Sequence, residues 1–144
     1  MNNINKDGRL PLGTKIGYGA AALSDGTAYV FFYSFFLLFL TDYAGVNPLW
    51  AGSISLIVVL WDAVTDPFIG WLSDNCRSKK GRRRPFMLIG IFPWLITLTL
   101  MYTKVDLTGG AQFFYYVVMA MLFWTSYTLC DVPYKALGAE LTDN

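Results

Sequence analysis

The chain has 144 residues, of which 55% are hydrophobic and 17% aromatic but only 15% charged. This mixture is too apolar and too poor in charge for an ordinary soluble domain, so it favours a protein embedded in a lipid bilayer. The net charge of +1 gives no general attraction to nucleic acid, and the positions of Cys76 and Cys130 indicate neither a disulfide framework nor a metal-binding knuckle.

Four apolar stretches are long enough to cross the hydrocarbon core as helices. A transmembrane helix needs roughly 20 mostly apolar residues, and the stretches that fit lie at about 16–41, 48–72, 86–103 and 111–139. Runs such as VFFYSFFLLFL do not alternate as the strands of a membrane barrel do. The sequence therefore predicts an all-α membrane protein, with four transmembrane helices in a single domain over residues 1–144.

The basic residues predict the orientation of these helices. The N-terminal tail and the loop at 73–85 hold nine of the eleven Lys and Arg residues, whereas the loops at 42–47 and 104–110 hold only Lys104. Short loops rich in Lys and Arg stay in the cytoplasm, so we expect a multi-pass protein of the inner or plasma membrane with a cytoplasmic N-terminus. We interpret the end of the chain, just past the fourth stretch, as a sign that further transporter helices are missing.

Ionisable residues inside the predicted spans are the strongest indication of function. Each costs roughly 2.5–3.5 kcal/mol near a helix centre, which excludes exposure to lipid and requires a partner, water or a role. These residues are Asp25 in the first span, Asp62 and Asp66 in the second, and Asp131 and Lys135 in the fourth.

Asp62 and Asp66 predict a cation site. They are four residues apart and share one helix face, with the hydroxyl groups of Ser55 and Thr65 nearby. Two carboxylates on one turn repel each other unless a cation neutralises them, and the cation can be a shared proton or a hard ion such as Na⁺. We expect no cofactor and no metal other than this possible Na⁺.

Aromatic and charged residues predict a substrate surface on the first and fourth spans. In the first span Tyr29 lies near the face of Asp25, and in the fourth a stripe contains Trp124, Tyr127, Thr128, Asp131 and Lys135. Rings stack on a sugar and carboxylates accept its hydroxyl groups, so the pattern suits a sugar. Packing between helices is the alternative for the aromatic residues.

Lys135 has three possible roles in this stripe. It lies four residues after Asp131, so the two charges can neutralise each other. Alternatively its ammonium can extend to the membrane interface, or it can bind an anionic substrate such as a hexuronide. We favour the internal pair with Asp131.

Three segments resemble motifs of one transporter family. GWLSDNCRSKKGRRRP, from Gly70, is similar to the loop between helices 2 and 3 of the major facilitator superfamily. WDAVTDPFIGW, from Trp61, and YTLCDVPYKALGAEL, from Tyr127, resemble signatures of the glycoside-pentoside-hexuronide:cation symporters, whose best-known member is melibiose permease. The similarity extends to KIGYG from Lys15 and so covers nearly the whole chain.

The resemblance implies the first four helices of a major facilitator N-terminal six-helix half, in a twelve-helix transporter that works by alternating access. By position, Asp62 and Asp66 match the family's cation-site carboxylates, Thr128 a hydroxyl ligand of that site, and Asp131 a sugar-binding acid. The departures are Thr65 in place of a cation-binding Asn, Gly26 in place of a sugar-binding Asp, and Lys135 in place of a Trp. They weaken the case for Na⁺ and melibiose, and they leave H⁺ coupling at least on a par with Na⁺.

The basic loop is a gate element in this family. Its residues here are Asp74, Arg77, Gly81, Arg82 and Arg83, and Asp74 can pair with the arginines to hold the cytoplasmic helix ends together. The same basic residues can instead serve only to fix the orientation and contact anionic lipid.

These observations predict a transporter and not an enzyme. It couples entry of H⁺ or Na⁺ to uptake of a sugar or glycoside, and its partners are this substrate, the bilayer and the remaining transporter helices, with no nucleic acid. One alternative is a lipid or drug carrier on the same scaffold. Another is a complete four-helix protein that acts as a membrane adaptor or a homodimer.

Overall fold

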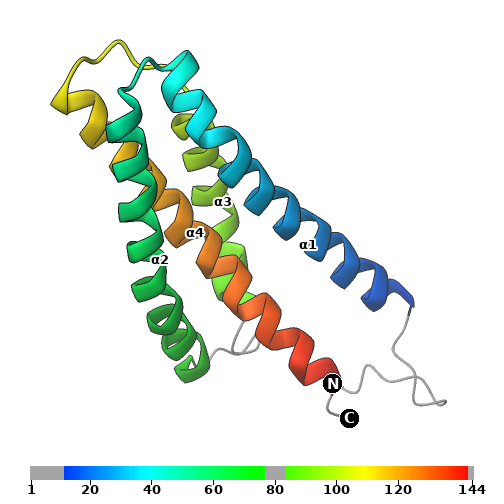
Figure 1. Ribbon diagram of the computed structural model, residues 1–144. Helices are drawn as coiled ribbons and strands as arrows, with labels where there is room; N and C mark the ends of the chain where they lie inside the picture. The colour runs from blue at the N-terminus through cyan, green and yellow to red at the C-terminus, as the bar shows by residue number, and fades with distance from the viewer. Residues whose placement is uncertain (1–11, 77–83, 143–144) are drawn as a thin grey trace, which may run out of the picture. The chain divides into compact units, whose positions relative to one another are not determined.

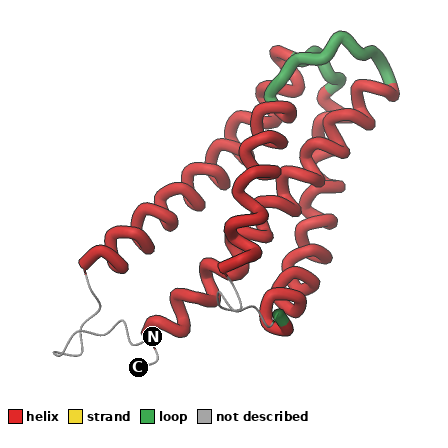
Figure 2. Tube along the Cα trace, turned by 180° about the vertical axis from the view of Figure 1, so that it is seen from behind, coloured by secondary structure: helices red, strands yellow, loops and turns green. Residues whose placement is uncertain are grey.

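The computed structural model describes residues 12–76 and 84–142, which are helical apart from short connections (Figure 2). Its elements, in chain order, are α1 (Leu12–Phe31), the π-helical turns η1 (Phe32–Phe36) and η2 (Phe39–Tyr43), α2 (Pro48–Asn75), α3 (Arg84–Met101) and α4 (Gly110–Thr142) (Figure 1). No strand occurs in these two ranges. The all-α class is therefore confirmed, and each of the four apolar stretches coincides with helix.

The chain forms two compact units, residues 1–35 and 36–144, which are described separately. In the first unit the aromatic side chains of α1 and η1 lie one turn apart along the helix. The ring centroids of Tyr29 and Tyr33 are 4.5 Å apart, and those of Phe31 and Phe35 are 5.1 Å apart.

In the second unit α4 is the central helix, because it packs against both α2 and α3. Helices α2 and α4 run in the same direction and α3 runs opposite to them (Figure 1). Two side-chain contacts join α2 to the same face of α4, from Trp61 to Thr125 and from Asp62 to Thr128. A different face of α4 meets α3.

The contact between α3 and α4 is close at Gly90. A Cβ atom at this position would lie 2.7 Å from Cys130 Sγ, 3.0 Å from Leu129 Cβ and 3.1 Å from the carbonyl oxygen of Ser126. The Cys130 thiol donates a hydrogen bond to the carbonyl oxygen of Met87, at 3.5 Å. Small residues allow membrane helices to approach closely, so Gly90 permits this crossing.

The loops at 44–47 and 102–109 lie at the same end of the second unit, which we call the two-loop end (Figures 1 and 2). Gln112 Nε2 donates to the carbonyl oxygen of Ala44 at 2.7 Å, and Tyr115 Oη donates to that of Leu100 at 2.9 Å. Tyr116 Oη donates to the carbonyl oxygen of Thr103 at 3.2 Å. Neutral side chains of α4 thus donate to backbone carbonyl groups in these loops and in the last turn of α3.

Local sequence explains where α2 begins. Asn47 accepts a hydrogen bond from the backbone N–H of Leu49 at 2.9 Å, and Pro48 occupies the first helical position. Both choices are typical of a helix N-terminus. Gly45 turns the chain just before it with φ of +71°, a value that favours glycine.

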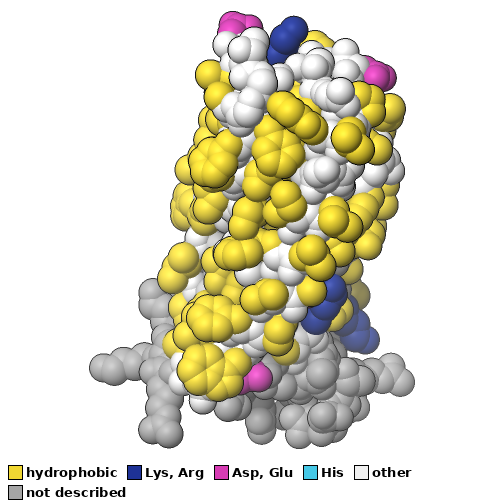
Figure 3. All heavy atoms as spheres, turned by 60° about the vertical axis from the view of Figure 1, so that its left-hand side comes forward, with side chains coloured by type: hydrophobic (Ala, Val, Ile, Leu, Met, Phe, Trp, Pro, Cys, Tyr) yellow, Lys and Arg dark blue, Asp and Glu magenta, His cyan; other side chains and the backbone are white. Residues whose placement is uncertain are grey.

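Within the described residues two helices are long and apolar enough to cross a membrane, Pro48–Asn75 and Gly110–Ala136, and a shorter apolar helix spans Pro85–Met101. Helix α2 also carries large apolar side chains that are at least 60% exposed, at Leu49, Leu56, Leu60, Val64, Phe68 and Trp71. Hydrophobic side chains cover the face shown in Figure 3, and the acidic side chains visible there lie near its ends. A surface of this kind suits hydrocarbon better than water.

Candidate functional site

The centre of the site is a contact between α2 and α4. Thr128 Oγ1 donates a hydrogen bond to Asp62 Oδ1 at 3.3 Å. Thr128 is 1% exposed, whereas Asp62 is half-buried. The contact brings together a carboxylate and a hydroxyl group that are 66 residues apart in the sequence.

Two further carboxyl groups lie around Asp62. Asp66 lies one turn further along α2, and the charges of Asp66 and of Asp131 on α4 both act on the Asp62 carboxylate. The packing agrees with this grouping, because Gly70 of α2 faces Val132 of α4, with 3.7 Å between an ideal Cβ and Val132 Cγ1. Along their helices, Asp66 and Asp131 therefore lie between the contact of Asp62 with Thr128 and the contact of Gly70 with Val132.

The hydroxyl groups expected beside the carboxylates donate their hydrogen bonds to different acceptors. Ser55 donates to the carbonyl oxygen of Ala51 at 3.2 Å, one turn back along its own helix. Thr65 is buried and donates to the backbone carbonyl oxygen of Asp62 at 3.3 Å. Among the described residues, the Thr128 hydroxyl group donates to the Asp62 carboxylate, so the oxygen-rich cluster is built across two helices.

Asp131 and Lys135 form an ion pair within α4. Lys135 Nζ lies 2.7 Å from Asp131 Oδ2, and the side chains are 63% and 10% exposed respectively. The lysine is thus the exposed partner of an almost buried acid. Internal neutralisation, the arrangement favoured from the (i, i+4) spacing, is the one that the structure contains.

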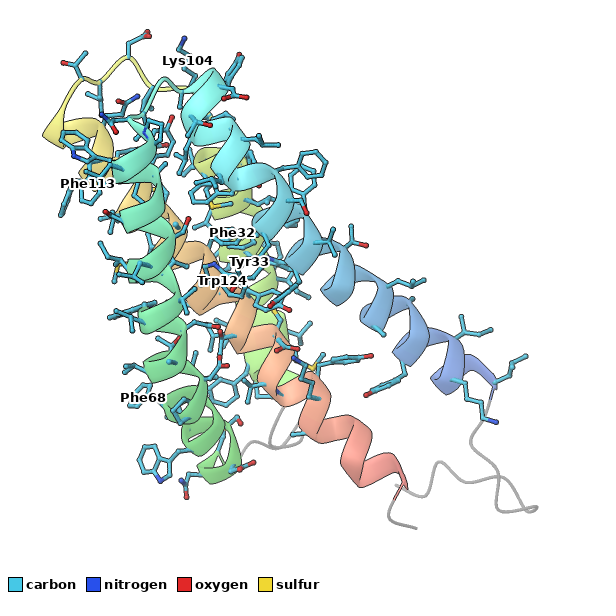
Figure 4. The ribbon with its side chains drawn as sticks, viewed as in Figure 1. Phe32, Tyr33, Phe68, Lys104, Phe113 and Trp124 are labelled. Atoms are coloured by element: carbon cyan, nitrogen blue, oxygen red, sulfur yellow. The ribbon has the colours of Figure 1, made fainter. Side chains whose placement is uncertain are left out.

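The aromatic residues of the predicted stripe on α4 pack on one another. The ring centroids of Trp124 and Tyr127 are 5.1 Å apart, and Trp94 of α3 lies 6.0 Å from Tyr127. Trp124 and Tyr127 are buried, at 2% and 6% exposure; Figure 4 labels Trp124 on α4. The two rings therefore contribute to helix packing, and a substrate role for Trp124 stays a prediction.

Other predicted residues lie outside this cluster or outside the described residues. Asp25 and Tyr29 belong to α1 in the first unit, and the side chain of Asp25 is not described. Asp74 lies in the last turn of α2. The gate residues Arg77, Gly81, Arg82 and Arg83 fall in the range 77–83, which is not described.

Sequence reasoning missed a second link between α2 and α4. Trp61 Nε1 donates a hydrogen bond to Thr125 Oγ1 at 2.9 Å. Trp61 precedes Asp62 in the chain, and Thr125 lies just under one turn before Thr128. The signal was a hydrogen-bonding aromatic residue directly before an intramembrane carboxylate, but its partner could be found only from the packing of the helices.

The cluster is suited to binding a monovalent cation. Carboxylates and hydroxyl oxygens are the ligands that protons and hard cations prefer. Among the described side chains, no group of three His, Cys, Asp or Glu residues is arranged as a metal site. The site thus combines carboxyl groups with a threonine hydroxyl.

Comparison with known proteins identifies the family. Residues 17–144 match the model of the family described as MFS/sugar transport protein. The chain is 39% identical over 142 residues to an uncharacterized symporter of Synechocystis sp., covering 94% of this chain and 26% of the relative. It is 31% identical over 130 residues to a glucuronide carrier protein homolog of Escherichia coli, covering 90% and 28%.

A vertebrate protein is also similar. The sodium-dependent lysophosphatidylcholine symporter 1-A of Danio rerio is 37% identical over 120 residues, covering 83% of this chain and 22% of the relative. The chain thus spans about a quarter of the length of these three curated relatives. The family match covers nearly all of the chain, and the relatives are symporters or carriers. The chain therefore belongs to the MFS/sugar transport protein family, among the glycoside-pentoside-hexuronide:cation symporters of the major facilitator superfamily.

Proposed function

We propose that the full-length protein is a cation-coupled symporter that takes up a sugar or glycoside by alternating access. The contact between Asp62 and Thr128 carries this proposal, because it gathers cation ligands from two helices inside an apolar bundle. Membership of a symporter family supports it. The remaining site residues would come from the rest of the protein.

The proposed topology has four transmembrane helices in this chain and a cytoplasmic N-terminus. The apolar helices α2 and α4 support it, together with the shorter apolar α3 and the uneven distribution of Lys and Arg. In a variant with Cys130→Ser, an impermeant thiol reagent applied to intact cells should leave Cys76 unlabelled. A cysteine at Asn47 should be labelled, and the opposite pattern would invert the topology.

The coupling ion is H⁺ or Na⁺, held by Asp62, Asp66 and Thr128 with Thr65 alongside. Asp62 and Asp66 repel each other when both are ionised, so one monovalent cation is enough to relieve the repulsion. Binding one cation also lowers the free-energy cost of keeping the two carboxylates in the low-dielectric interior of the membrane. The cation and the substrate would thus favour the same conformations, which is the basis of coupled transport.

A sugar or glycoside is the proposed substrate. Asp131 can accept hydrogen bonds from hydroxyl groups, and the relative named as a glucuronide carrier protein homolog supports a sugar derivative. The ion pair between Asp131 and Lys135 favours a neutral glycoside over a uronide, because the lysine charge is already compensated inside α4.

A lysophospholipid is the second candidate substrate. The chain is more similar to the sodium-dependent lysophosphatidylcholine symporter, at 37% identity, than to the glucuronide carrier homolog, at 31%. A zwitterionic headgroup could approach the pair of Asp131 and Lys135 with matching charges.

Transport by the full-length protein in proteoliposomes tests both candidates. Radiolabelled methyl glycosides, a glucuronide and lysophosphatidylcholine are each supplied with an inward Na⁺ gradient, an inward H⁺ gradient or neither. Concentrative uptake of a glycoside that requires one gradient supports the proposal. Gradient-driven uptake of lysophosphatidylcholine alone would establish the second candidate, and gradient-independent equilibration of every compound would refute cation coupling.

A further inference from the structure

We propose that Trp61 and Thr125 are positioning residues that set the cation affinity of Asp62. This proposal rests on the cation site proposed above. Trp61 and Thr125 are not ligands of the cation, and their role is to hold Asp62 in position through the hydrogen bond between them. Trp61 Nε1 and Thr125 Oγ1 are 2.9 Å apart. Their hydrogen bond crosses the interface between α2 and α4, as does the bond between Asp62 and Thr128.

The two links across this interface differ in strength. The bond from Thr128 to Asp62 measures 3.3 Å, which is long for a hydroxyl donor and a carboxylate acceptor. The bond from Trp61 to Thr125, at 2.9 Å, has an ordinary length for an N–H donor. The stronger link therefore fixes the separation and rotation of the helices, and the weaker link follows from it.

The direction of the stronger link is determined. Thr125 Oγ1 donates its own proton to the carbonyl oxygen of Met121 at 2.8 Å, which leaves its oxygen to accept from Trp61. An indole N–H can only donate. Neither group can reverse its role, so this bond keeps one geometry whether Asp62 is charged, protonated or bound to Na⁺.

The surroundings preserve the bond. Trp61 is 38% exposed at the edge of the contact between α2 and α4, on a helix that we propose to be surrounded by hydrocarbon. No water competes for donors and acceptors in hydrocarbon. Because Trp61 and Asp62 are consecutive, a rotation of α2 that broke the bond would also turn the Asp62 carboxylate relative to Thr128.

The test measures cation binding by the purified full-length transporter. The melting temperature is titrated with NaCl against choline chloride at constant ionic strength, and with pH in the absence of Na⁺. Thr125→Val and Trp61→Phe each remove one partner of the bond and keep most of the side-chain volume. Thr125→Ser keeps the hydroxyl group, and Trp71→Phe is the control, since Trp71 is an exposed indole on the same helix.

The apparent affinity for the cation that stabilises the wild type should fall about three- to tenfold in Thr125→Val and in Trp61→Phe, the range expected for one hydrogen bond between membrane helices. The double variant should be no weaker than either single variant, because one bond is lost in all three. Thr125→Ser and Trp71→Phe should stay within about twofold of the wild type. The substrate KM at saturating cation should not change.

The possible outcomes separate the two proposals. If the wild type is stabilised by a cation and the variants bind it with unchanged affinity, the positioning role is refuted and the cation site stands, even if the variants melt at lower temperature. If neither Na⁺ nor H⁺ stabilises the wild type, the cation site fails and the positioning role fails with it. Should Trp61→Phe not fold, the comparison of Thr125→Val with Thr125→Ser decides.

Discussion

The two-loop end and the carboxylate cluster use polar side chains in opposite ways. At the two-loop end, Gln112, Tyr115 and Tyr116 are neutral and each donates to a backbone carbonyl group. In the cluster the Thr128 hydroxyl donates to an ionisable carboxylate, other carboxylate charges act on that same group, and carboxylate oxygens outnumber hydroxyl donors. Donors matched to backbone acceptors fix a structure, whereas an excess of acceptor oxygen creates a place for a cation.

The cluster also differs from the two-loop end in how it is supported. At the two-loop end, side chains of α4 bond to loops and to a helix end, while the cluster lies between α2 and α4, and α4 in turn packs against α3. On one side of α4 are the hydrogen bonds to α2, and on the other is the close contact with Gly90. From this difference we expect substitutions in the cluster to impair the coupling of substrate transport to the cation. We expect substitutions at the two-loop end and at Gly90 to lower the stability of the folded protein.

The largest effect is expected from neutralising both carboxylates of α2. In the full-length protein, Asp62→Asn combined with Asp66→Asn should abolish accumulation against a gradient, because amides carry no charge for a cation to balance. Exchange of substrate across the membrane should persist. Uptake into vesicles with an imposed H⁺ or Na⁺ gradient measures this, with Asp106→Asn in the loop at 102–109 as control. Uphill uptake by the double variant would contradict the assignment.

A smaller effect is expected at the crossing of α3 and α4. Gly90→Ala places a methyl group 2.7 Å from Cys130 Sγ, and overpacking of this kind costs typically about 1–3 kcal/mol. The melting temperature in detergent should therefore fall. Gly52→Ala in α2 is the matched control, since a Cβ there meets nothing within 4 Å. Equal losses in the two variants would show that the crossing is not tightly packed.

A comparable or smaller loss of stability is expected at the two-loop end. Gln112→Leu leaves the carbonyl group of Ala44 without its donor, which costs roughly 1–3 kcal/mol when the group is buried. Thr99→Val is the control, because Thr99 is exposed and its hydroxyl group donates to the carbonyl oxygen of Leu95 in its own helix. The dependence of uptake on the cation gradient should be unchanged, and a change would show that this end takes part in coupling.

The smallest effect is expected at Lys135. Its side chain is 63% exposed although Asp131 is almost buried, and solvent screens the charge of so exposed a lysine, so Lys135→Gln should alter transport by only a few-fold. Uptake of a neutral glycoside and of a uronide, each with and without Na⁺, distinguishes the roles of the lysine. A gain of Na⁺ dependence supports internal pairing with Asp131, and selective loss of the uronide would instead assign Lys135 to the substrate.

Hydropathy predicted the positions of the helices because the bilayer restricts spanning segments to long apolar runs. It did not predict their ends. The helix α2 continues to Asn75, beyond the predicted 72, and α3 ends at Met101, before the predicted 103. Hydrogen bonding along the backbone does not stop where the apolar residues stop, so composition alone could not locate these termini.

The site was predictable only in part, for a related reason. The spacing of Asp62 and Asp66 places them on one face of one helix, and the spacing of Asp131 and Lys135 permits their ion pair. The contact with Thr128 was indicated by resemblance alone. The bond between Trp61 and Thr125 and the crossing at Gly90 depend on how one helix is rotated against another, which periodicity within a single helix does not specify.

The central position of α4 has a consequence for biogenesis. Helices α2 and α3 are consecutive in the chain, yet both make their extensive contacts with α4, which is synthesised after them. Because membrane chains emerge from the ribosome N-terminal end first, Asp62 enters the bilayer before its partner Thr128 exists. Until α4 arrives, the nascent chain contains an intramembrane acid with no partner from that helix, and insertion machinery or a bound proton must shelter it from lipid. Assembly of the second unit is therefore completed by its last helix and not built up pair by pair.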